Sequence, residues 1–320
     1  LTIVLFPFYK DLKKDQVSSF GKDLGESLVS SSENIISFNI VGGFLNLTIS
    51  DKYYLNFIES IKDDIDFGKS KKQNETFIVE FSSPNTNKPL HLGHIRNNLL
   101  GYSISKILEA NGKNVKKVQI INDRGIHICK SMIAWKQYGE GKTPKSENIK
   151  GDKFVGDYYI LFDKIHNEQK NELLKSGIET DKAEDSTQIM QDAKNELMNW
   201  ENNDEETLKI WNMMNQWVYE GFESTYKLLG VSFDKNYYES QTYLLGKDII
   251  KEGLSKNVFY TKEDSSIWIN LDDEGLDEKL LLRSDGTSVY MTQDLGTAVQ
   301  RISDNENVKG MIYTVGNEQD

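Results

Sequence analysis

The first part of the chain changes from helical to alternating spacing of its apolar residues. Four apolar residues recur every three or four positions, as on one face of a helix: Val17, Phe20, Leu24 and Leu28. Two strand-like runs follow at 35–41 and 44–49, and Gly42 and Gly43 join them as a turn. This order predicts a small α+β domain over residues 1–70.

A polar stretch at 68–75 reads as a linker to a segment with the order strand, helix, strand. Residues 76–82 are rich in β-branched and aromatic side chains, 93–110 have helical spacing, and 115–121 form a second strand-like run. This order predicts a βαβ unit of a parallel, doubly wound sheet, whose ligands bind beyond the carboxyl ends of its strands. The loop 83–92 lies at such an end.

The rest of the chain is first helical and then strand-like. Helical patterns dominate from about 139 to 231, and we interpret their best stripe as helix packing: Leu208, Trp211, Met214, Val218, Phe222 and Leu229. Strands are predicted at 258–261, 266–271, 280–283 and 288–292, followed by a helix over 294–302 and a strand at 309–315. A helical insertion over about 139–256 therefore interrupts the predicted sheet domain, 71–320.

The net charge of −12 argues at first against a nucleic-acid partner. The acidic residues are concentrated, however: between Glu179 and Glu206 there are ten Asp and Glu against two Lys. The rest of the chain is close to neutral, which leaves room for a basic face elsewhere.

Cys129 is the only cysteine, which excludes an internal disulfide and fits a reducing cytosol. We interpret it as a small buried hydrophobic residue. No run approaches the roughly 18 apolar residues of a membrane span. We therefore expect no membrane contact. By default we also expect a cytoplasmic location and a monomer.

The segment Glu80-Phe-Ser-Ser-Pro-Asn-Thr-Asn-Lys-Pro-Leu-His-Leu-Gly-His94 carries the chemistry. Its His91-x-Gly93-His94 motif sits where a loop enters a helix N-terminus, which offers backbone N–H groups and a positive dipole end to phosphate. Gly93 lets the backbone approach a nucleotide without a Cβ. Both imidazoles and the Lys88 ammonium can donate to phosphate oxygens in the transition state. We predict Lys88, His91 and His94 as catalytic and, with Gly93, as nucleotide-binding.

A zinc cluster of His91, His94, His127 and Cys129 is the alternative interpretation of this region. The glycine between the histidines and the Pro-Asn-x-x-Lys before them have no metal rationale, so we predict no metal site. By default His127 is a structural or surface histidine. His166 falls on the exposed-looking end of a helix and receives no role.

The complete string resembles the signature of class I aminoacyl-tRNA synthetases, and within them the arginyl branch. The likeness continues in Gly-Gly-Phe-Leu-Asn at 42–46, in Asn-Asp-Arg-Gly at 122–125, in 285–294 and in 315–319. The resemblance implies a Rossmann-like catalytic domain behind an N-terminal domain that contacts the tRNA. We predict that this N-terminal domain presents a basic surface to the tRNA.

The resemblance also implies a pocket for L-arginine, whose planar guanidinium is best held by carboxylates that accept it bidentately. The predicted substrate-binding residues are Glu80, Ser82, Asn85, Asp123, Tyr290, Asp294 and Gln319. Asn85 is expected at the α-amino or carboxylate end of the substrate. Ordinary packing is the alternative for Tyr290, and a helix N-cap for Asp294.

The implied reaction has two steps: ATP, with Mg2+ on its phosphates, activates L-arginine to arginyl-adenylate, and tRNA(Arg) then takes the arginyl group. The chain departs from many family members in having Arg124 where they have Trp. The Lys-Met-Ser-Lys-Ser-type loop and the anticodon-binding domain of the family lie outside the 320 residues, so we expect the isolated chain to be inactive or impaired. Two alternatives remain: another His-x-Gly-His nucleotidylyl transferase, and a non-catalytic module that binds tRNA or arginine.

Overall fold

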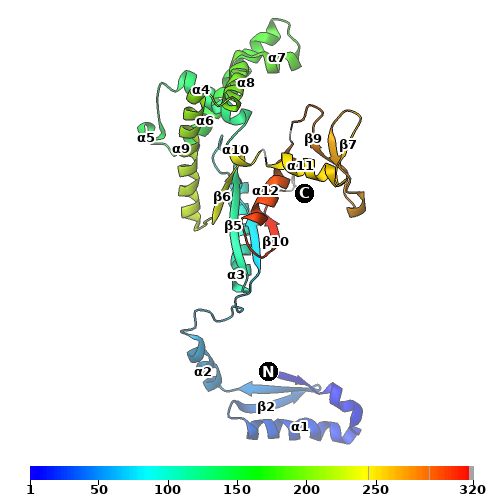
Figure 1. The fold of residues 1–320 in the computed structure, drawn as a ribbon. Coiled ribbons are helices and arrows are strands. Elements are labelled where there is room, and N and C mark those ends of the chain that lie inside the picture. The colour runs from blue at the N-terminus through cyan, green and yellow to red at the C-terminus, as the bar shows by residue number, and fades with distance from the viewer. Residues whose placement is uncertain (244, 288, 317–320) are drawn as a thin grey trace. The chain divides into compact units, whose positions relative to one another are not determined.

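The computed structural model describes residues 1–243, 245–287 and 289–316, and their side chains except those at 9, 11, 14, 15, 17, 18 and 290. The chain divides into two compact units, Leu1–Lys69 and Ser70–Asp320 (Figure 1). Each unit is described by itself.

The first unit is a three-stranded antiparallel sheet with one face covered by a helix. Its elements are β1 (Thr2–Val4), η1 (Phe6–Asp11), α1 (Lys14–Ser31), β2 (Ile35–Val41), β3 (Phe44–Ile49) and α2 (Asp51–Ile61), and the strand order is β1-β3-β2. Leu5, Leu45 and Leu47 form its core beneath α1. Both predicted strands are confirmed, and Gly42 and Gly43 make the tight turn because both have positive φ, 56° and 86°.

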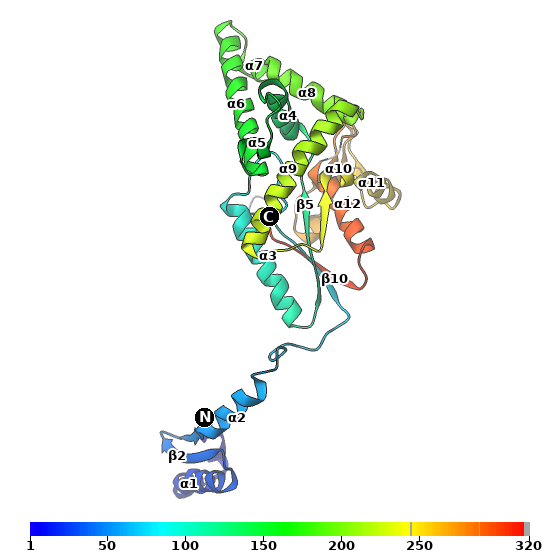
Figure 2. The same ribbon diagram turned by 90° about the vertical axis from the view of Figure 1, so that its left-hand side faces the viewer.

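The second unit is built on a parallel sheet of four strands. Their order is β10 (Val308–Tyr313), β4 (Thr76–Glu80), β5 (Asn114–Ile121) and β6 (Lys235–Tyr238). The helices α3 (Leu92–Ala110) and α12 (Tyr290–Ser303) lie on opposite faces of this sheet (Figure 2). Right-handed crossovers place the two helices on opposite faces. The chain passes through α3 on its way from β4 to β5, and through α12 on its way back across the sheet to β10, which lies on the other side of β4. The strand order therefore reverses between β4 and β10, which is where such sheets bind ligands.

Six helices separate β5 from β6: α4 (Ile126–Tyr138), α5 (Pro144–Glu147), α6 (Gly151–Lys175), α7 (Thr180–Ser186), α8 (Gln188–Glu201) and α9 (Glu205–Leu229). Met214, Val218 and Phe222 of α9 are buried against Met132 of α4 and Phe154 of α6. The interpretation of this stripe as helix packing is confirmed.

The stretch 139–256 assigned to the helical insertion contains β6, which pairs in parallel with β5, so the sheet already resumes at Lys235. β6 has only four residues, Lys-Asn-Tyr-Tyr, and lacks the apolar run that marks a buried strand. After α10 (Glu239–Thr242) and α11 (Gly246–Ser255), the next strands form a separate antiparallel sheet. Its elements are β7 (Tyr260–Thr261), β8 (Ile267–Ile269), η2 (Asp272–Glu274) and β9 (Lys279–Leu282).

The predicted strand at 288–292 is wrong in its described part, because residues 290–292 begin α12. Thr292 explains the difference: its hydroxyl accepts the N–H of Val289 at 3.3 Å and caps the helix. The N-cap alternative for Asp294 is wrong for the same reason, since Asp294 lies inside this helix.

His166 is buried, so its expected exposed position was wrong. Its Nδ1 lies 2.7 Å from the Thr187 hydroxyl and its Nε2 lies 3.1 Å from a carboxylate oxygen of Glu184, which anchors α6 to α7. Thr187 and Glu184 lie 21 and 18 residues away from His166 along the chain, so local spacing did not reveal these contacts.

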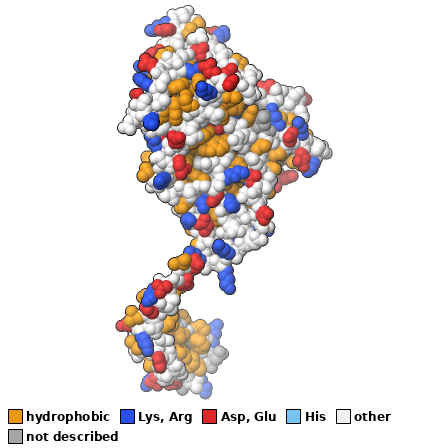
Figure 3. Space-filling model, turned by 60° about the vertical axis from the view of Figure 1, so that its left-hand side comes forward, with side chains coloured by type: hydrophobic (Ala, Val, Ile, Leu, Met, Phe, Trp, Pro, Cys, Tyr) orange, Lys and Arg blue, Asp and Glu red, His pale blue; other side chains and the backbone are white. Residues whose placement is uncertain are grey.

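On the face drawn in Figure 3, acidic and basic side chains are interspersed over both units. In the first unit Lys22, Lys62 and Lys69 each pair with an acidic residue three or four positions away. This face gives the predicted basic surface no support.

Among the helices of the described residues, none combines the length and apolarity that a membrane crossing requires.

Candidate functional site: the carboxyl edge of the parallel sheet

The His-x-Gly-His motif forms the N-terminal cap of α3. His91 is the N-cap residue, and its Nδ1 accepts the N–H of Gly93 at 3.1 Å. A Cβ on Gly93 would lie 2.9 Å from Cε1 of His91, so any other residue here would force the His91 ring to shift from the helix end. His94 closes the cap, because its Nδ1 accepts the N–H of His91 at 3.2 Å.

These contacts determine which ring nitrogen carries the proton. A neutral imidazole whose Nδ1 accepts a hydrogen bond has its proton on Nε2. Burial, together with the nearby positive charges of His91 and Lys88, lowers the pKa of His94 to about 4. His94 is therefore neutral near pH 7 and has an Nε2–H available to donate to an anion.

Lys88 supplies the positive charge at this edge. Its side chain is exposed, and its charge contributes to lowering the pKa of both His94 and His127, although burial is the larger cause in each case. His127 Nδ1 lies 3.0 Å from the Tyr159 hydroxyl. The structure thus brings Lys88 together with His91 and His94, and adds His127 to their surroundings.

The chain leaves β4 through an unusual turn. Ser82 and Ser83 both have positive φ, 72° and 44°, which is uncommon outside glycine and clusters at functional sites. Ser82 is buried, and its hydroxyl lies 2.7 Å from that of Tyr226, which in turn donates to Gln119 at 2.8 Å. Ser83 accepts the N–H of Ile120 at 3.2 Å and donates to Oε1 of Glu80 at 2.7 Å.

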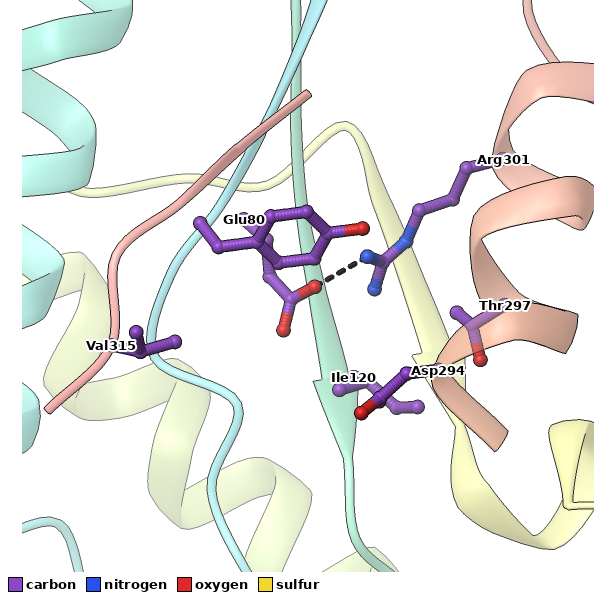
Figure 4. A pocket seen from close by; sticks show the side chains of 7 residues that line it. Glu80, Ile120, Asp294, Thr297, Arg301 and Val315 are labelled. Carbon is purple, nitrogen blue, oxygen red and sulfur yellow. Dashed lines mark ion pairs between the residues drawn. The ribbon is translucent and has the colours of Figure 1, made fainter. Parts of the chain in front are cut away.

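A pocket of about 310 Å³ lies at the point where the strand order reverses (Figure 4). It is lined by Glu80, Ile120, Asp294, Thr297, Arg301, Tyr313 and Val315. Glu80 ends β4 beside Tyr313 of β10, and Asp294, Thr297 and Arg301 point toward it from one face of α12. Glu80 and Asp294, the two carboxylates predicted to receive a guanidinium, therefore line the same pocket.

The two carboxylates differ in what they already bind. Glu80 is 8% exposed, and its Oε2 forms an ion pair with Nη1 of Arg301. Asp294 is open to the pocket, and no described residue donates a hydrogen bond to its carboxylate or pairs with it. Burial by the surrounding protein, and secondarily the charge of Glu80, raise the pKa of Asp294. Asp294 is the acceptor with free capacity.

Asp123 follows β5 and is fully buried. Its carboxylate accepts the N–H and the hydroxyl of Ser240, both at 2.8 Å, and the hydroxyl of Tyr219 at 3.0 Å. Burial raises the pKa of Asp123, and these hydrogen bonds oppose that rise. Asp123 thereby connects the end of β5 to α9 and α10.

Arg124 lies between aromatic rings. Its guanidinium is 3.9 Å from the ring centre of Tyr243 and 5.2 Å from that of Trp200, and it pairs with Glu201 at 3.1 Å. Glu239 lies near it at the carboxyl end of β6, where burial raises its pKa to about 7 despite the opposing charge of Arg124.

The other predicted residues divide into two groups. Asn85 is exposed and bridges to Asn122, which extends the β4–β5 pairing into the loop. The side chain of Tyr290 and the whole of Gln319 lie outside the described residues. Ser83, Glu239 and Arg301 also belong to this region, although their sequence patterns did not single them out. For Arg301, the spacing of seven from Asp294 was a signal that both share a helix face.

Cys129 is buried at 2% exposure, which confirms the interpretation of it as a hydrophobic residue. Burial raises the pKa of its thiol to about 12. In the described part of the chain, no group of three His, Cys, Asp or Glu side chains is arranged to hold a metal ion.

Comparison with known proteins places this chain in a family. The family profile described as tRNA synthetases class I (R), catalytic domain, matches residues 58–320. Arginine–tRNA ligases of Flavobacterium psychrophilum and Bacteroides thetaiotaomicron are 50% and 51% identical over 100% of this chain, which spans 55% and 53% of their lengths. The chain thus spans about half the length of these curated relatives.

Solved arginyl-tRNA synthetases share the fold. The Thermus thermophilus structure matches with a TM-score of 0.55 and 21% identity over 93% of this chain and 46% of its own. The Plasmodium falciparum structure matches with a TM-score of 0.56 and 18% identity over 92% of this chain and 54% of its own.

Proposed function

Because the chain belongs to the class I tRNA synthetase (R) family, we propose that it is the portion of an arginine–tRNA ligase that binds L-arginine and ATP. The observation that carries the proposal is the pocket in Figure 4, where two carboxylates meet at the carboxyl edge of the sheet. Carboxylates accept a guanidinium bidentately, and a lysine ammonium cannot reproduce that contact. The proposed partners are L-arginine and tRNA(Arg), and the proposed compartment is the cytoplasm.

The neighbouring cap of α3 fits the triphosphate of ATP. Lys88 supplies a positive charge, and His91 and His94 supply Nε2–H donors at a helix N-terminus, which favours anions. Mg2+ is the cofactor that we expect on these phosphates. When bound there, Mg2+ would offset phosphate charge.

The proposed chemistry is attack of the arginine carboxylate on the α-phosphorus of ATP with release of pyrophosphate, followed by transfer of the arginyl group to the terminal adenosine of the tRNA. Lys88, His91 and His94 would stabilise the charge that develops on the phosphates. Asn85 would orient the α-amino or carboxylate end of the amino acid. Ser82 and Asp123 would act through the contacts that hold the loops around the pocket.

Amino-acid-dependent exchange of pyrophosphate into ATP tests this function, with each of the twenty amino acids supplied separately, with and without tRNA(Arg). Exchange that depends on L-arginine and on no other amino acid supports the ligase assignment. Exchange with another amino acid contradicts it. Binding of L-arginine without exchange would restrict this chain to the binding role.

A further inference from the structure

Helix α6 passes beside the loop that carries Lys88 and then along α4, against which it packs (Figure 2). A Cβ on Gly156 of α6 would lie 2.8 Å from Cδ of Pro89 and 3.6 Å from Cα of Lys88, so the loop rests directly on the helix at this point. Three residues later, the hydroxyl of Tyr159 lies 3.0 Å from Nδ1 of His127, the second residue of α4. Positions three apart are neighbours on a helix surface, so α6 holds Lys88 and His127 next to each other.

Lys130 extends this row along the same two helices. It lies three residues after His127 on α4, and its Nζ lies 5.3 Å from the ring centre of Phe162, which follows Tyr159 by three residues on α6. Three residues of a helix rise about 4.5 Å. Lys88, His127 and Lys130 therefore follow one another along the seam between α4 and α6.

The contact with Tyr159 leaves His127 with a free donor. Partial burial is the main cause that lowers the pKa of His127, and the charges of Lys130 and Lys88 add to it, so the imidazole is neutral near pH 7. Burial also raises the pKa of the Tyr159 hydroxyl, which therefore keeps its proton. A phenol is a stronger donor than a neutral imidazole, so Tyr159 donates to Nδ1 and the proton of the ring lies on Nε2. Because His127 is exposed, this Nε2–H is open to a ligand.

The charges along this row favour an anion. Neither Lys88 nor Lys130 forms an ion pair with a described residue. Asp163 of α6 acts on His127 with a charge that raises the pKa of the ring, but among the described residues it forms no hydrogen bond with the three donors. Two lysines against one aspartate leave a net charge of +1 beside a neutral N–H donor. A phosphate group offers the negative charge and the acceptor oxygens that match this set.

We propose that His127 and Lys130 form, with Lys88, a phosphate subsite that lies outside the cap of α3 and is held in place by α6. The proposal rests on the proposed function, in which two substrates carry phosphate: ATP has its triphosphate, and tRNA(Arg) has the backbone of its 3′ strand. Both must reach the carboxyl edge of the sheet, where this row begins. His127 and Lys130 bind a phosphate oxygen directly, whereas Tyr159 is a positioning residue.

Titrations with ATP, with tripolyphosphate and with an RNA hairpin that carries a tRNA acceptor stem and its single-stranded 3′ end identify the source of the phosphate. His127→Phe keeps a ring but removes the donor, and Lys130→Met keeps the apolar stem but removes the charge. Each should weaken binding of ATP and tripolyphosphate, or of the RNA, by about three- to tenfold. If the RNA is the ligand, Lys130→Met should also reduce the slope of log K against log salt by about 0.7.

The affinity for L-arginine is the control for the fold, because this ligand carries no phosphate and should bind both variants as it binds wild type. Lys194→Met removes an exposed lysine of α8 that pairs with Asp185 of α7, and should leave every affinity unchanged. His127→Gln restores a side-chain N–H and should recover part of the affinity that His127→Phe loses. Tyr159→Phe releases the ring tautomer and should lose less affinity than His127→Phe.

Loss of affinity for ATP and tripolyphosphate would assign the subsite to the triphosphate, and loss of affinity for the RNA would assign it to the tRNA; either result supports the proposal. Unchanged affinity for all three phosphate ligands in either variant would overturn it. An equal loss of L-arginine affinity would also overturn it, because the variants would then act through the fold. Failure of the wild type to bind both ATP and the RNA is a different result, which refutes the proposed function and this inference with it.

Discussion

The hydroxyl of Ser83 donates a hydrogen bond to Oε1 of Glu80 at 2.7 Å and accepts the N–H of Ile120 at 3.2 Å. This contact depends on a turn in which two successive serines have positive φ. A non-glycine residue in that region costs on the order of 1 kcal/mol, and such conformations persist where surrounding contacts determine them. Here the turn directs the Ser83 hydroxyl back toward the carboxylate that ends β4.

Ser83→Ala is therefore expected to weaken L-arginine binding by about tenfold, because Glu80 loses one of the two groups that orient it. Calorimetry of the variant checks this expectation. Ser103→Ala, at an exposed position of α3, is the control and should bind as wild type does. Unchanged affinity in Ser83→Ala would mean that Arg301 alone orients Glu80.

The low pKa of His94 predicts a pH dependence of stability. Burial is the main cause of its decrease from 6.5 to about 4. Between these values the unfolded chain binds a proton that the folded chain does not. The stability from this group is therefore complete above pH 6.5 and is lost as the pH falls toward 4. Because the side chain is only half-buried, we expect roughly 1 kcal/mol.

Urea unfolding at about pH 5 and at about pH 7.5 measures this contribution. All five tryptophans lie beyond residue 70, so their fluorescence reports the second unit. His94→Asn removes the titrating ring and should reduce the difference between the two pH values. An identical difference in wild type and variant would assign the pH dependence to other groups.

Asp123→Asn tests the structural role of the buried carboxylate. The amide has one acceptor oxygen where the carboxylate has two, and Ser240 and Tyr219 present three donors to it. We expect the free energy of unfolding to fall by about 2 to 4 kcal/mol in urea titrations. Asp157→Asn removes an exposed pair with Lys153 and should cost less than about 0.5 kcal/mol. If the free energy of unfolding falls no further in Asp123→Asn than in this control, Asp123 has no structural role and is again a candidate substrate ligand.

Local patterns predicted the elements that carry their own signal. The strands at 35–41 and 44–49 match β2 and β3, and the helix predicted from 93 to 110 matches α3 within one residue. The motif around His91 also indicated where the loop meets the helix. In each of these segments periodicity, turn residues and cap residues favour the same structure.

Elements that depend on tertiary contacts were not predictable in the same way. β6 is recognisable only by its pairing with β5, and residues 290–292 have strand-like composition but enter α12 because Thr292 caps it. The pairing of Arg301 with Glu80 joins residues more than 200 positions apart. Sequence patterns showed two carboxylates that suit a guanidinium, but not the cation that accompanies them.

The preference of the pocket for L-arginine is tested most directly by calorimetric titration of this chain with L-arginine, and with L-lysine and ATP for comparison, in wild type and Asp294→Asn. We predict that wild type binds L-arginine and not L-lysine, that Asp294→Asn loses L-arginine, and that both proteins bind ATP equally. Equal binding of L-lysine and L-arginine, or unchanged L-arginine binding in Asp294→Asn, would contradict the assignment of this pocket to the guanidinium.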